Sequence, residues 1–384
     1  MHTFWILFFG LIASLWIVQA IRAGFGMARL PWLSDIAPVD SRVAPQVSII
    51  FAARDEAEKL PAAIATLLAQ DYPHFEVVAV NDRSTDQTPA ILHDLQKTAQ
   101  NLTVTDISSL PPGWLGKPHA LVAGYEKSRG EWLVFTDADV HFAPDVLRRA
   151  VALATEQKLD HLTLLTAVEM RGFWETVAIS FFGLGFVFGN EPWQASNPRS
   201  TRYVGIGAFQ MVRRSAYEKS GGHSRLRMEV IEDMKLGKLM KMAGLRSCVA
   251  VAQDLVRVRW HSGVRNVIRG VTKNMFAAVH YNAFFAAGAI LLALIMSVSP
   301  FIGVAFASGW AQVFASIAAV VAVLTHAGMI WSTGASPLYG FTHPLGALLF
   351  CWMIGRSAIA TLWRGGVVWR GTFYPLEELR KGMV

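Results

Sequence analysis

Long apolar runs near both ends of the chain constrain its fold more than any other feature of the sequence. One runs from Phe4 to Ile21, and three more follow Lys273, at about Phe284–Val298, Ile302–Ile330 and Leu345–Trp363. Because a helix needs about 20 apolar residues to cross a bilayer, the middle segment of the three is long enough and the other two are marginal without their flanks. The pattern predicts an N-terminal membrane anchor, a polar central region and a C-terminal cluster of membrane helices.

The composition agrees with a soluble domain joined to membrane helices. Hydrophobic residues make up 53% of the 384 residues, too many for an ordinary soluble protein, while 16% are charged. The formal net charge is +7, and no nucleic-acid-binding motif is present, so we interpret the excess as a basic belt that faces anionic lipid headgroups. Two distant cysteines, Cys248 and Cys351, offer no disulfide framework and suit a reducing compartment.

Basic residues beside the apolar runs predict the orientation in the membrane. Arg22 and Arg29 follow the first run, which favours an uncleaved anchor with a cytoplasmic flank over a cleaved signal peptide. The basic stretch from Arg257 to Lys273 places the start of the C-terminal cluster in the cytoplasm. Three crossings would then put the tail outside, yet the tail is itself basic, and the sequence leaves this conflict open. Phe173–Phe188 is apolar but short, and we expect an interfacial or core helix there.

Short apolar strands alternate with helical patterns in the central region. Strands are expected at Val47–Ala52, Phe75–Val80 and Trp132–Phe135, and helices at Ala57–Ala69, Pro89–Thr98 and Pro144–Thr155. This alternation predicts an α/β fold with a mainly parallel sheet, whose ligands bind at the carboxyl ends of the strands. The expected domains are residues 1–30 (anchor), 45–272 (cytoplasmic α/β domain) and 273–384 (membrane helices and basic tail).

Acidic motifs follow two of the expected strands. Asn81–Asp86 comes directly after the second strand, where Asp82 can accept hydrogen bonds from a base or a ribose, or the stretch can simply cap the next helix. Asp137 and Asp139 follow the third strand as an Asp-x-Asp pair. On an extended chain these carboxylates point the same way, which suits a hard divalent cation with open positions for diphosphate oxygens, although acids are also common in turns.

A third acidic pair, Glu232-Asp233, precedes a helical pattern. An acid near a helix start is a favourable partner of the helix dipole. It can also serve as a general base that takes a proton from an acceptor hydroxyl.

Taken together, the three motifs in this order resemble the GT-A domain of family 2 glycosyltransferases. The resemblance covers roughly residues 45–265. It includes Arg54-Asp55-Glu56, Gly116–Leu121, Gly205–Phe209 and Gly221-Gly222-His223, and the arrangement of anchor and C-terminal helices also matches. The branch it resembles most is the non-processive, lipid-modifying one, which includes ceramide glucosyltransferase and enzymes associated with hopanoid or carotenoid glycosylation. The tail segment Val368–Tyr374 also looks like that branch.

The resemblance implies roles for individual residues. Asp82, and Asp55 with it, would contact the donor nucleoside, and Lys117 would approach donor phosphate. Asp137 and Asp139 would hold the donor and its Mn²⁺ or Mg²⁺. Asp233 would be the base of an inverting single displacement, with Glu232 as the competing candidate. The implied partners are a nucleotide sugar, a UDP-sugar in particular, and a lipid acceptor, at the cytoplasmic face of a bacterial inner membrane.

One motif departs from the family pattern. The family often carries Gln or Arg, two further residues and then Arg-Trp as a platform for acceptor and diphosphate. Here Arg259-Trp260 is present but Val256 occupies the upstream position. Trp260 is therefore a sugar contact or a membrane-interface anchor, and His261 is a metal or diphosphate ligand or an interfacial surface group.

Several other functions remain as alternatives. They are transfer to a polyprenyl phosphate, processive polysaccharide synthesis, and a non-catalytic nucleotide-sugar binder or transporter. A transporter would place polar residues inside its spans, where Arg356 and His326 are the candidates. The intact set of Asp137, Asp139 and Asp233 favours catalysis.

Overall fold

The structure is a computed structural model that describes residues 2–384, and these divide into two compact units. The sheet unit comprises residues 30–169, 192–259 and 370–384, and the helical unit comprises residues 2–29, 170–191 and 260–369.

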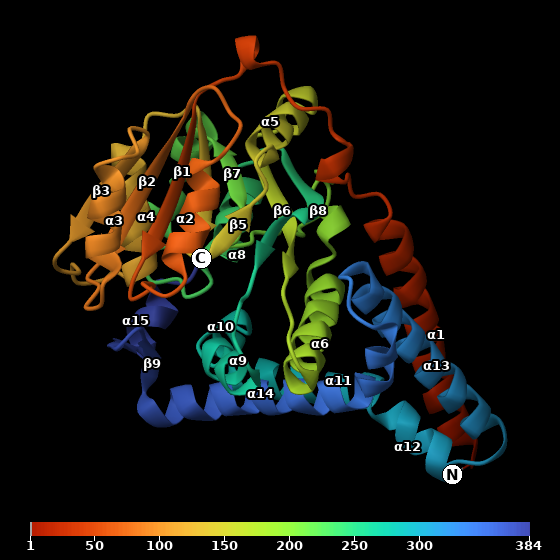
Figure 1. Ribbon diagram of the computed structural model, residues 1–384. Coiled ribbons are helices and arrows are strands. Elements are labelled where there is room, and N and C mark those ends of the chain that lie inside the picture. The colour runs from red at the N-terminus through yellow and green to blue at the C-terminus, as the bar shows by residue number, and fades with distance from the viewer. Residues whose placement is uncertain (1) are drawn as a thin grey trace. The chain divides into compact units, whose positions relative to one another are not determined.

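The sheet unit is built on an eight-stranded mixed sheet with the order β3-β2-β1-β4-β7-β6-β8-β5. Neighbours β3-β2, β2-β1, β1-β4 and β6-β8 are parallel, whereas β7 runs antiparallel to β4 and β6, and β5 antiparallel to β8 (Figure 1). The strands are β1 (Val47–Ala53), β2 (Phe75–Asp82), β3 (Leu102–Ile107), β4 (Trp132–Asp137), β5 (Val140–Phe142), β6 (His161–Val168), β7 (Gln210–Arg213) and β8 (Ser247–Val258).

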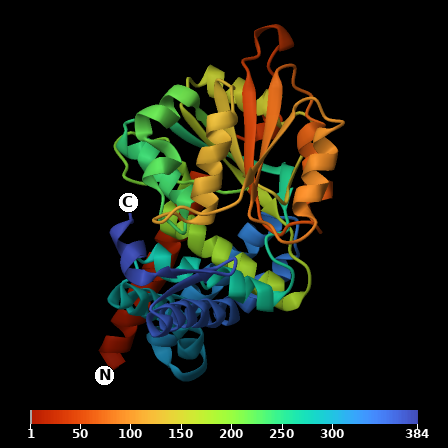
Figure 2. The ribbon, with the colours of Figure 1, turned by 90° about the vertical axis from the view of Figure 1, so that its left-hand side faces the viewer.

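Helices cover both faces of this sheet (Figure 2). On one face, α2 (Leu60–Leu68), α3 (Thr88–Gln96) and α5 (Val146–Glu156) contribute to the larger apolar core. On the other, α4 (Gly116–Lys127), α7 (Arg214–Ser220) and α8 (Glu232–Met242) pack in a second core around Ile50, Val78 and Phe135. Because β1, β2 and β4 are buried from both sides, their sequences are continuous apolar runs.

The three predicted strands and three predicted helices of this unit are confirmed, with their ends shifted by a few residues. The helical pattern expected after Glu232-Asp233 is α8, whereas helices α4 and α7 and strands β3, β5, β6, β7 and β8 were not predicted. In β3 only Leu102 and Ile107 are buried, because this strand lies at the edge of the sheet, and its alternation with Thr and Asp gives a weak signal. The unit ends in a tail with β10 (Thr372–Pro375) and α15 (Leu376–Lys381).

The helical unit is an assembly of helices. They are α1 (His2–Met27), α6 (Phe173–Asn190), α9 (Val264–Val271), α10 (Asn274–Ala278), α11 (Ala283–Ser297), α12 (Ser299–Phe306), α13 (Gly309–Ser332) and α14 (His343–Arg364), followed by strand β9 (Gly366–Trp369). Of these helices, α1, α6, α11, α13 and α14 are long and apolar. Helices α1 and α13 lie side by side (Figure 1), where Ala311, Ala315, Ala318 and Ala322 form a buried row. Such small residues let two helix backbones approach closely.

Five segments among residues 2–384 are long and apolar enough to cross a membrane by length and composition. They are His2–Met27, Phe173–Gln194, Ala283–Phe306, Gly309–Ser332 and Pro337–Arg364. The segment expected at Phe173–Phe188 continues to Gln194 and is long enough to cross by this criterion, while the expectation of an interfacial or core helix there stays a prediction. The prediction of one continuous apolar segment at Ile302–Ile330 is wrong, because these residues belong to two helices, α12 and α13. The chain leaves helical geometry at Ala307 and restarts at Gly309, whose φ of +58° suits a glycine.

Candidate active site

The acidic residues singled out in the sequence lie at the carboxyl edge of the sheet. Asp82 ends β2 and Asp137 ends β4, and Asp55 follows β1 directly. Because β1, β2 and β4 are parallel neighbours, these three strand ends meet at one edge. The edge of a parallel sheet where the strands end is the usual ligand-binding position in such folds.

Lys117 is the centre of the site. Its Nζ lies 2.6 Å from Asp137 Oδ1 and 2.6 Å from Glu232 Oε1, at the first turn of α4. Burial opposes the charged form, but the carboxylates of Asp137, Glu232 and Asp233 together raise the pKa of Lys117 well above that of an ordinary lysine. Lys117 therefore stays charged at any physiological pH, and the structure brings three of the predicted carboxylates, Asp137, Glu232 and Asp233, together around it.

Asp233 is held by two backbone N–H groups. Its Oδ2 accepts a hydrogen bond of 2.9 Å from the N–H of Gly207, and its Oδ1 one of 2.8 Å from the N–H of Met234. A Cβ atom at position 207 would stand 2.7 Å from Asp137 Oδ2. Gly207 thus allows the carboxylates of Asp137 and Asp233 to lie on either side of one stretch of backbone, without a side chain between them.

Glu232 and Asp233 differ in their surroundings although they are adjacent at the start of α8. The Glu232 side chain is buried, with 4% of its surface exposed, and its partner is the Lys117 ammonium. Asp233 is only partly buried. Of the two, Asp233 is the carboxylate with open surface from which an acceptor hydroxyl can approach.

Asp137 and Asp139 bind different lysines. Strand β4 ends at Asp137, and Asp139 lies in the turn before β5, not on the extended strand as expected. Asp139 Oδ2 is 2.7 Å from Lys59 Nζ, whereas Asp137 pairs with Lys117. Within residues 2–384 no group of three or more His, Cys, Asp or Glu side chains is placed to hold a metal ion together.

The loops after β1 and β2 are fastened to each other. Asp55 Oδ1 accepts a hydrogen bond of 2.7 Å from the N–H of Thr85, and the N–H of Asp55 donates to Ser84 Oγ at 3.1 Å. Asp55 and Arg83 both have positive φ, +54° and +57°, a conformation that non-glycine residues adopt mainly at turns and functional sites. Asp55 therefore shapes these loops with its own carboxylate.

Asp82 is buried, and its carboxylate forms an ion pair with the guanidinium of Arg83. Arg83 Nε and Nη2 lie 2.7 and 3.0 Å from its two oxygens. A Cβ at Gly116 would stand 2.4 Å from Asp82 Oδ2, so the start of α4 lies directly against this pair. The helix-capping interpretation of this motif applies to Asp86, whose Oδ1 accepts from the N–H of Thr88 at 2.9 Å.

The remaining predicted residues are Arg259, Trp260 and His261, which follow strand β8 directly. The backbone oxygen of Arg259 accepts a hydrogen bond of 3.4 Å from Lys59 Nζ. Trp260 and His261 belong to the helical unit, where their rings stack with centroids 5.0 Å apart and Trp260 also packs on Phe182.

Sequence reasoning assigned no role to Lys59 or Arg83, which neutralise Asp139 and Asp82. The only signal for them was a cation within a few residues of an acidic motif, and such pairs are common on protein surfaces.

Comparison with known proteins agrees with this geometry. A mannosyltransferase from Pyrobaculum calidifontis, solved in complex with GDP-Man and Mn²⁺, superposes with a TM-score of 0.55 at 21% identity, covering 93% of this chain and 99% of that one. The sheet unit thus has the GT-A fold. The family profile "Glycosyl transferase family 2" matches residues 48–221, so this part of the chain is similar to glycosyl transferase family 2.

Two curated relatives are similar over part of their length. The 4,4'-diaponeurosporenoate glycosyltransferase of Staphylococcus haemolyticus is 23% identical, over 62% of this chain and 62% of its own. The beta-monoglucosyldiacylglycerol synthase of Nostoc sp. is 31% identical, over 46% of this chain and 38% of its own. The chain thus matches between about two fifths and three fifths of the length of these relatives.

Proposed function

We propose that the protein is an inverting glycosyltransferase that moves a sugar from a nucleotide sugar, a UDP-sugar in particular, to a hydroxyl group of a membrane lipid. The observation that supports this most directly is the cluster of Lys117, Asp137 and Asp233 around Gly207, at the carboxyl edge of the sheet. In this proposal the Lys117 ammonium binds phosphate, and the partly open Asp233 carboxylate near it takes up the proton.

The donor nucleoside is assigned to the β1 and β2 loops. Asp82 is the carboxylate that would accept hydrogen bonds from the base or the ribose, on releasing part of its contact with Arg83. Asp55 supports this role through its hydrogen bonds to the Ser84-Thr85 backbone and side chains. Lys117 would contact the diphosphate that follows the nucleoside.

The oxygens of Asp137 and Asp139 fit a hard divalent cation such as Mn²⁺ or Mg²⁺ in their donor chemistry. Their side chains are 39% and 18% exposed, and each faces a lysine ammonium. Such a cation, when bound, supplies positive charge that stabilises the departing nucleoside diphosphate. Lys59 and Lys117 would then turn from these carboxylates to phosphate oxygens. The same two lysines would thus neutralise Asp139 and Asp137 without donor and bind phosphate when the donor is present.

Asp233 is the proposed general base. The acceptor hydroxyl gives its proton to the Asp233 carboxylate as its oxygen forms a bond to the anomeric carbon. The bond from that carbon to the diphosphate oxygen breaks, and the nucleoside diphosphate leaves with the electron pair. A single displacement inverts the anomeric centre, and no covalent sugar–enzyme intermediate is formed.

The acceptor is assigned to the membrane. Five segments of the chain are apolar enough to cross a bilayer, and the two curated relatives are named for glycosylating a carotenoid acid and for making a glucosyl diacylglycerol. We propose an integral protein of a bacterial inner membrane with the sheet unit in the cytoplasm. Arg259, Trp260 and His261 are then candidates for acceptor or diphosphate contacts, because they occur where the chain passes between its units.

A panel of radiolabelled nucleotide sugars tests this function. Membranes that contain the protein are incubated with each donor and Mn²⁺ or Mg²⁺, and label is followed into an organic lipid extract, whose products are identified by mass. We expect one donor to yield a lipid that has gained a single sugar, with no product in EDTA and recovery on adding metal. Label in polymer, in polyprenyl phosphate sugar or in free sugar alone would contradict the proposed acceptor, and full activity in EDTA would contradict the metal.

A further inference from the structure

The C-terminal tail of the sheet unit reaches the donor edge of the sheet. Arg370 forms an ion pair through Nη2 with Glu56 Oε1 in the loop after β1. The tail then continues through β10, where Tyr374 is buried and interacts electrostatically with Arg83. Residues 370–374 therefore extend from the β1 loop to the Asp82–Arg83 pair.

Arg370 lies among the charged groups near Asp139. Glu56 interacts electrostatically with Arg370, Asp139 and Lys59, and its burial raises the pKa of its carboxyl. The Arg370 side chain is 46% exposed, whereas Glu56 is 16% exposed. Arg370 is therefore the member of the pair that can move toward a ligand, while Glu56 is fixed in the loop, where its own N–H donates to Thr88 Oγ1 at 2.9 Å.

A tight backbone turn at Arg370 and Gly371 fixes the position of Arg370. Arg370 and Gly371 both have positive φ, +48° and +77°, the combination that two-residue hairpin turns require. A buried anchor at Tyr374 on one side and this turn on the other give Arg370 a defined position relative to the sheet edge.

When a diphosphate binds at this edge, cations that now pair with carboxylates have to exchange them for phosphate oxygens. In the ion pairs of the described residues at this edge, five carboxylates share four cations, namely Asp139 with Lys59, Asp82 with Arg83, Asp137 and Glu232 with Lys117, and Glu56 with Arg370. A donor diphosphate adds negative charge to this arrangement. Arginine is suited to it, because its planar guanidinium binds two phosphate oxygens at once.

We propose that Arg370 is a further ligand of the donor diphosphate and that Glu56 holds it in place until the donor binds. On binding, the guanidinium exchanges the Glu56 carboxylate for phosphate oxygens, and the tail closes one side of the donor site. This inference depends on the proposed function only in taking a nucleoside diphosphate as the ligand.

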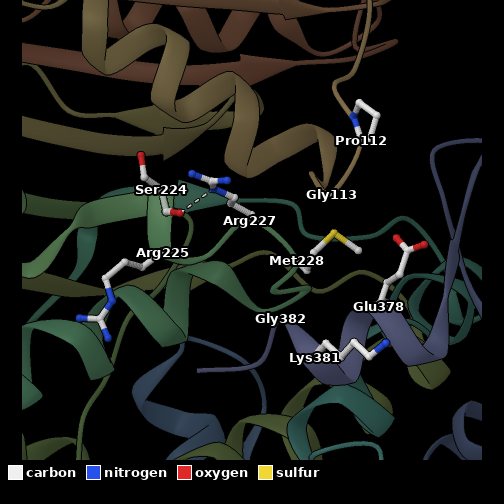
Figure 3. Close-up of a pocket in the computed structure, with 9 residues that line it drawn as sticks. All are labelled: Pro112, Gly113, Ser224, Arg225, Arg227, Met228, Glu378, Lys381 and Gly382. Carbon is white, nitrogen blue, oxygen red and sulfur yellow. Dashed lines mark hydrogen bonds between the residues drawn. The ribbon is translucent and has the colours of Figure 1, made fainter.

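The test measures binding of UDP and of GDP, each with MnCl₂, to the full-length protein in detergent by calorimetry. Arg370→Ala should weaken the binding of the preferred diphosphate about ten-fold, since one charge-assisted contact is lost. Arg370→Lys should recover part of that loss. Lys381→Ala is the matched control, because Lys381 lies on the same tail but lines a hollow of about 640 Å³ with Arg227 and Glu378 (Figure 3), and it should bind as wild type does.

Glu56→Gln separates a ligand role from a structural one. If Arg370 binds phosphate, removing its competitor leaves diphosphate affinity equal to wild type or higher. If the ion pair only braces the β1 loop, Glu56→Gln weakens binding as much as Arg370→Ala does, and the proposal is wrong. Equal affinity of wild type and Arg370→Ala would also overturn it, whereas a wild-type protein that binds neither diphosphate would overturn the proposed function itself.

Discussion

At the residue scale, the positions of the site carboxylates depend on individual backbone atoms. Gly207 is the clearest case, since its N–H holds Asp233 and its missing side chain leaves room for Asp137. A hydrogen atom at this position lets two carboxylates with different proposed roles, metal or donor binding and proton removal, occupy adjacent positions.

Gly207→Ala should therefore damage catalysis without unfolding the protein. The added methyl group would lie 2.7 Å from Asp137 Oδ2, closer than van der Waals contact allows, so Asp137 or the backbone that holds Asp233 has to move. A displacement of that size is expected to lower kcat/KM about 10²-fold. Steady-state kinetics with the preferred donor measure it, and Gly328→Ala, where the new methyl meets no atom within 4 Å, should retain normal activity. A Gly207→Ala variant with wild-type kinetics would show that these carboxylates do not need their present spacing.

At the scale of elements, burial explains which parts the sequence could predict. Strands β1, β2 and β4 were found because both of their faces are covered, and their apolar runs are continuous. Strand β7 has four residues and runs antiparallel, and no local pattern distinguishes it from a loop. The acidic motifs were found because they follow predicted strands, whereas the Arg370–Glu56 pair joins residues 314 positions apart, and spacing carries no information about such a contact.

Two buried histidines make the stability of the sheet elements depend on pH. His161 begins β6 and His223 lies before α8. Burial lowers the pKa of His161 to about 4 and that of His223 to about 3, from an ordinary value of 6.5. Both are neutral when folded, so the unfolded chain binds more protons below pH 6.5. Their contribution to stability is complete above pH 6.5 and decreases as the pH falls toward 4, by up to about 1.4 kcal/mol per pH unit for each.

Thermal unfolding of the detergent-solubilised protein between pH 7.5 and 5 should show this. The midpoint is expected to fall as the pH drops below 6.5, and the fall should be shallower in His161→Gln, which keeps hydrogen-bonding groups but cannot gain a proton. His74→Gln changes an exposed histidine and should leave the slope unchanged. An unfolding midpoint that stays constant down to pH 5 would contradict the assignment of both histidines as buried neutral groups.

At the scale of the whole molecule, the proposal requires the sheet unit to face the cytoplasm, where nucleotide sugars are made. Arg22, Arg29 and the basic residues from Arg257 to Lys273 predict this orientation, because basic flanks stay on the cytoplasmic side. Which of the five apolar segments cross the membrane decides the side of the sheet unit and of its tail.

Labelling of a cysteine at position 97 tests that orientation. The Lys97 side chain is 74% exposed in the sheet unit, and the two native cysteines are buried, so Lys97→Cys offers a single accessible thiol. A membrane-impermeant maleimide should fail to label it in intact cells and label it after lysis. The unsubstituted protein is the control for background, and labelling from outside intact cells would reverse the proposed topology.

The central claim is that the acidic cluster at the sheet edge carries out sugar transfer with Asp233 as the base. Asp233→Asn removes the ability to take a proton while keeping the size of the side chain. Its amide can still accept one of the two backbone hydrogen bonds, from Gly207 or Met234, that the carboxylate now accepts. Loss of a general base typically slows a reaction by about 10²–10⁴-fold.

The decisive measurement compares donor binding and turnover in wild type, Asp233→Asn and Glu232→Gln. We predict that Asp233→Asn binds the nucleoside diphosphate and metal nearly as wild type does, while kcat for sugar transfer to lipid falls by about 10²-fold or more. Near-normal turnover in Asp233→Asn together with an inactive Glu232→Gln would make Glu232 the base. Full turnover in both variants would contradict an inverting transfer at this site.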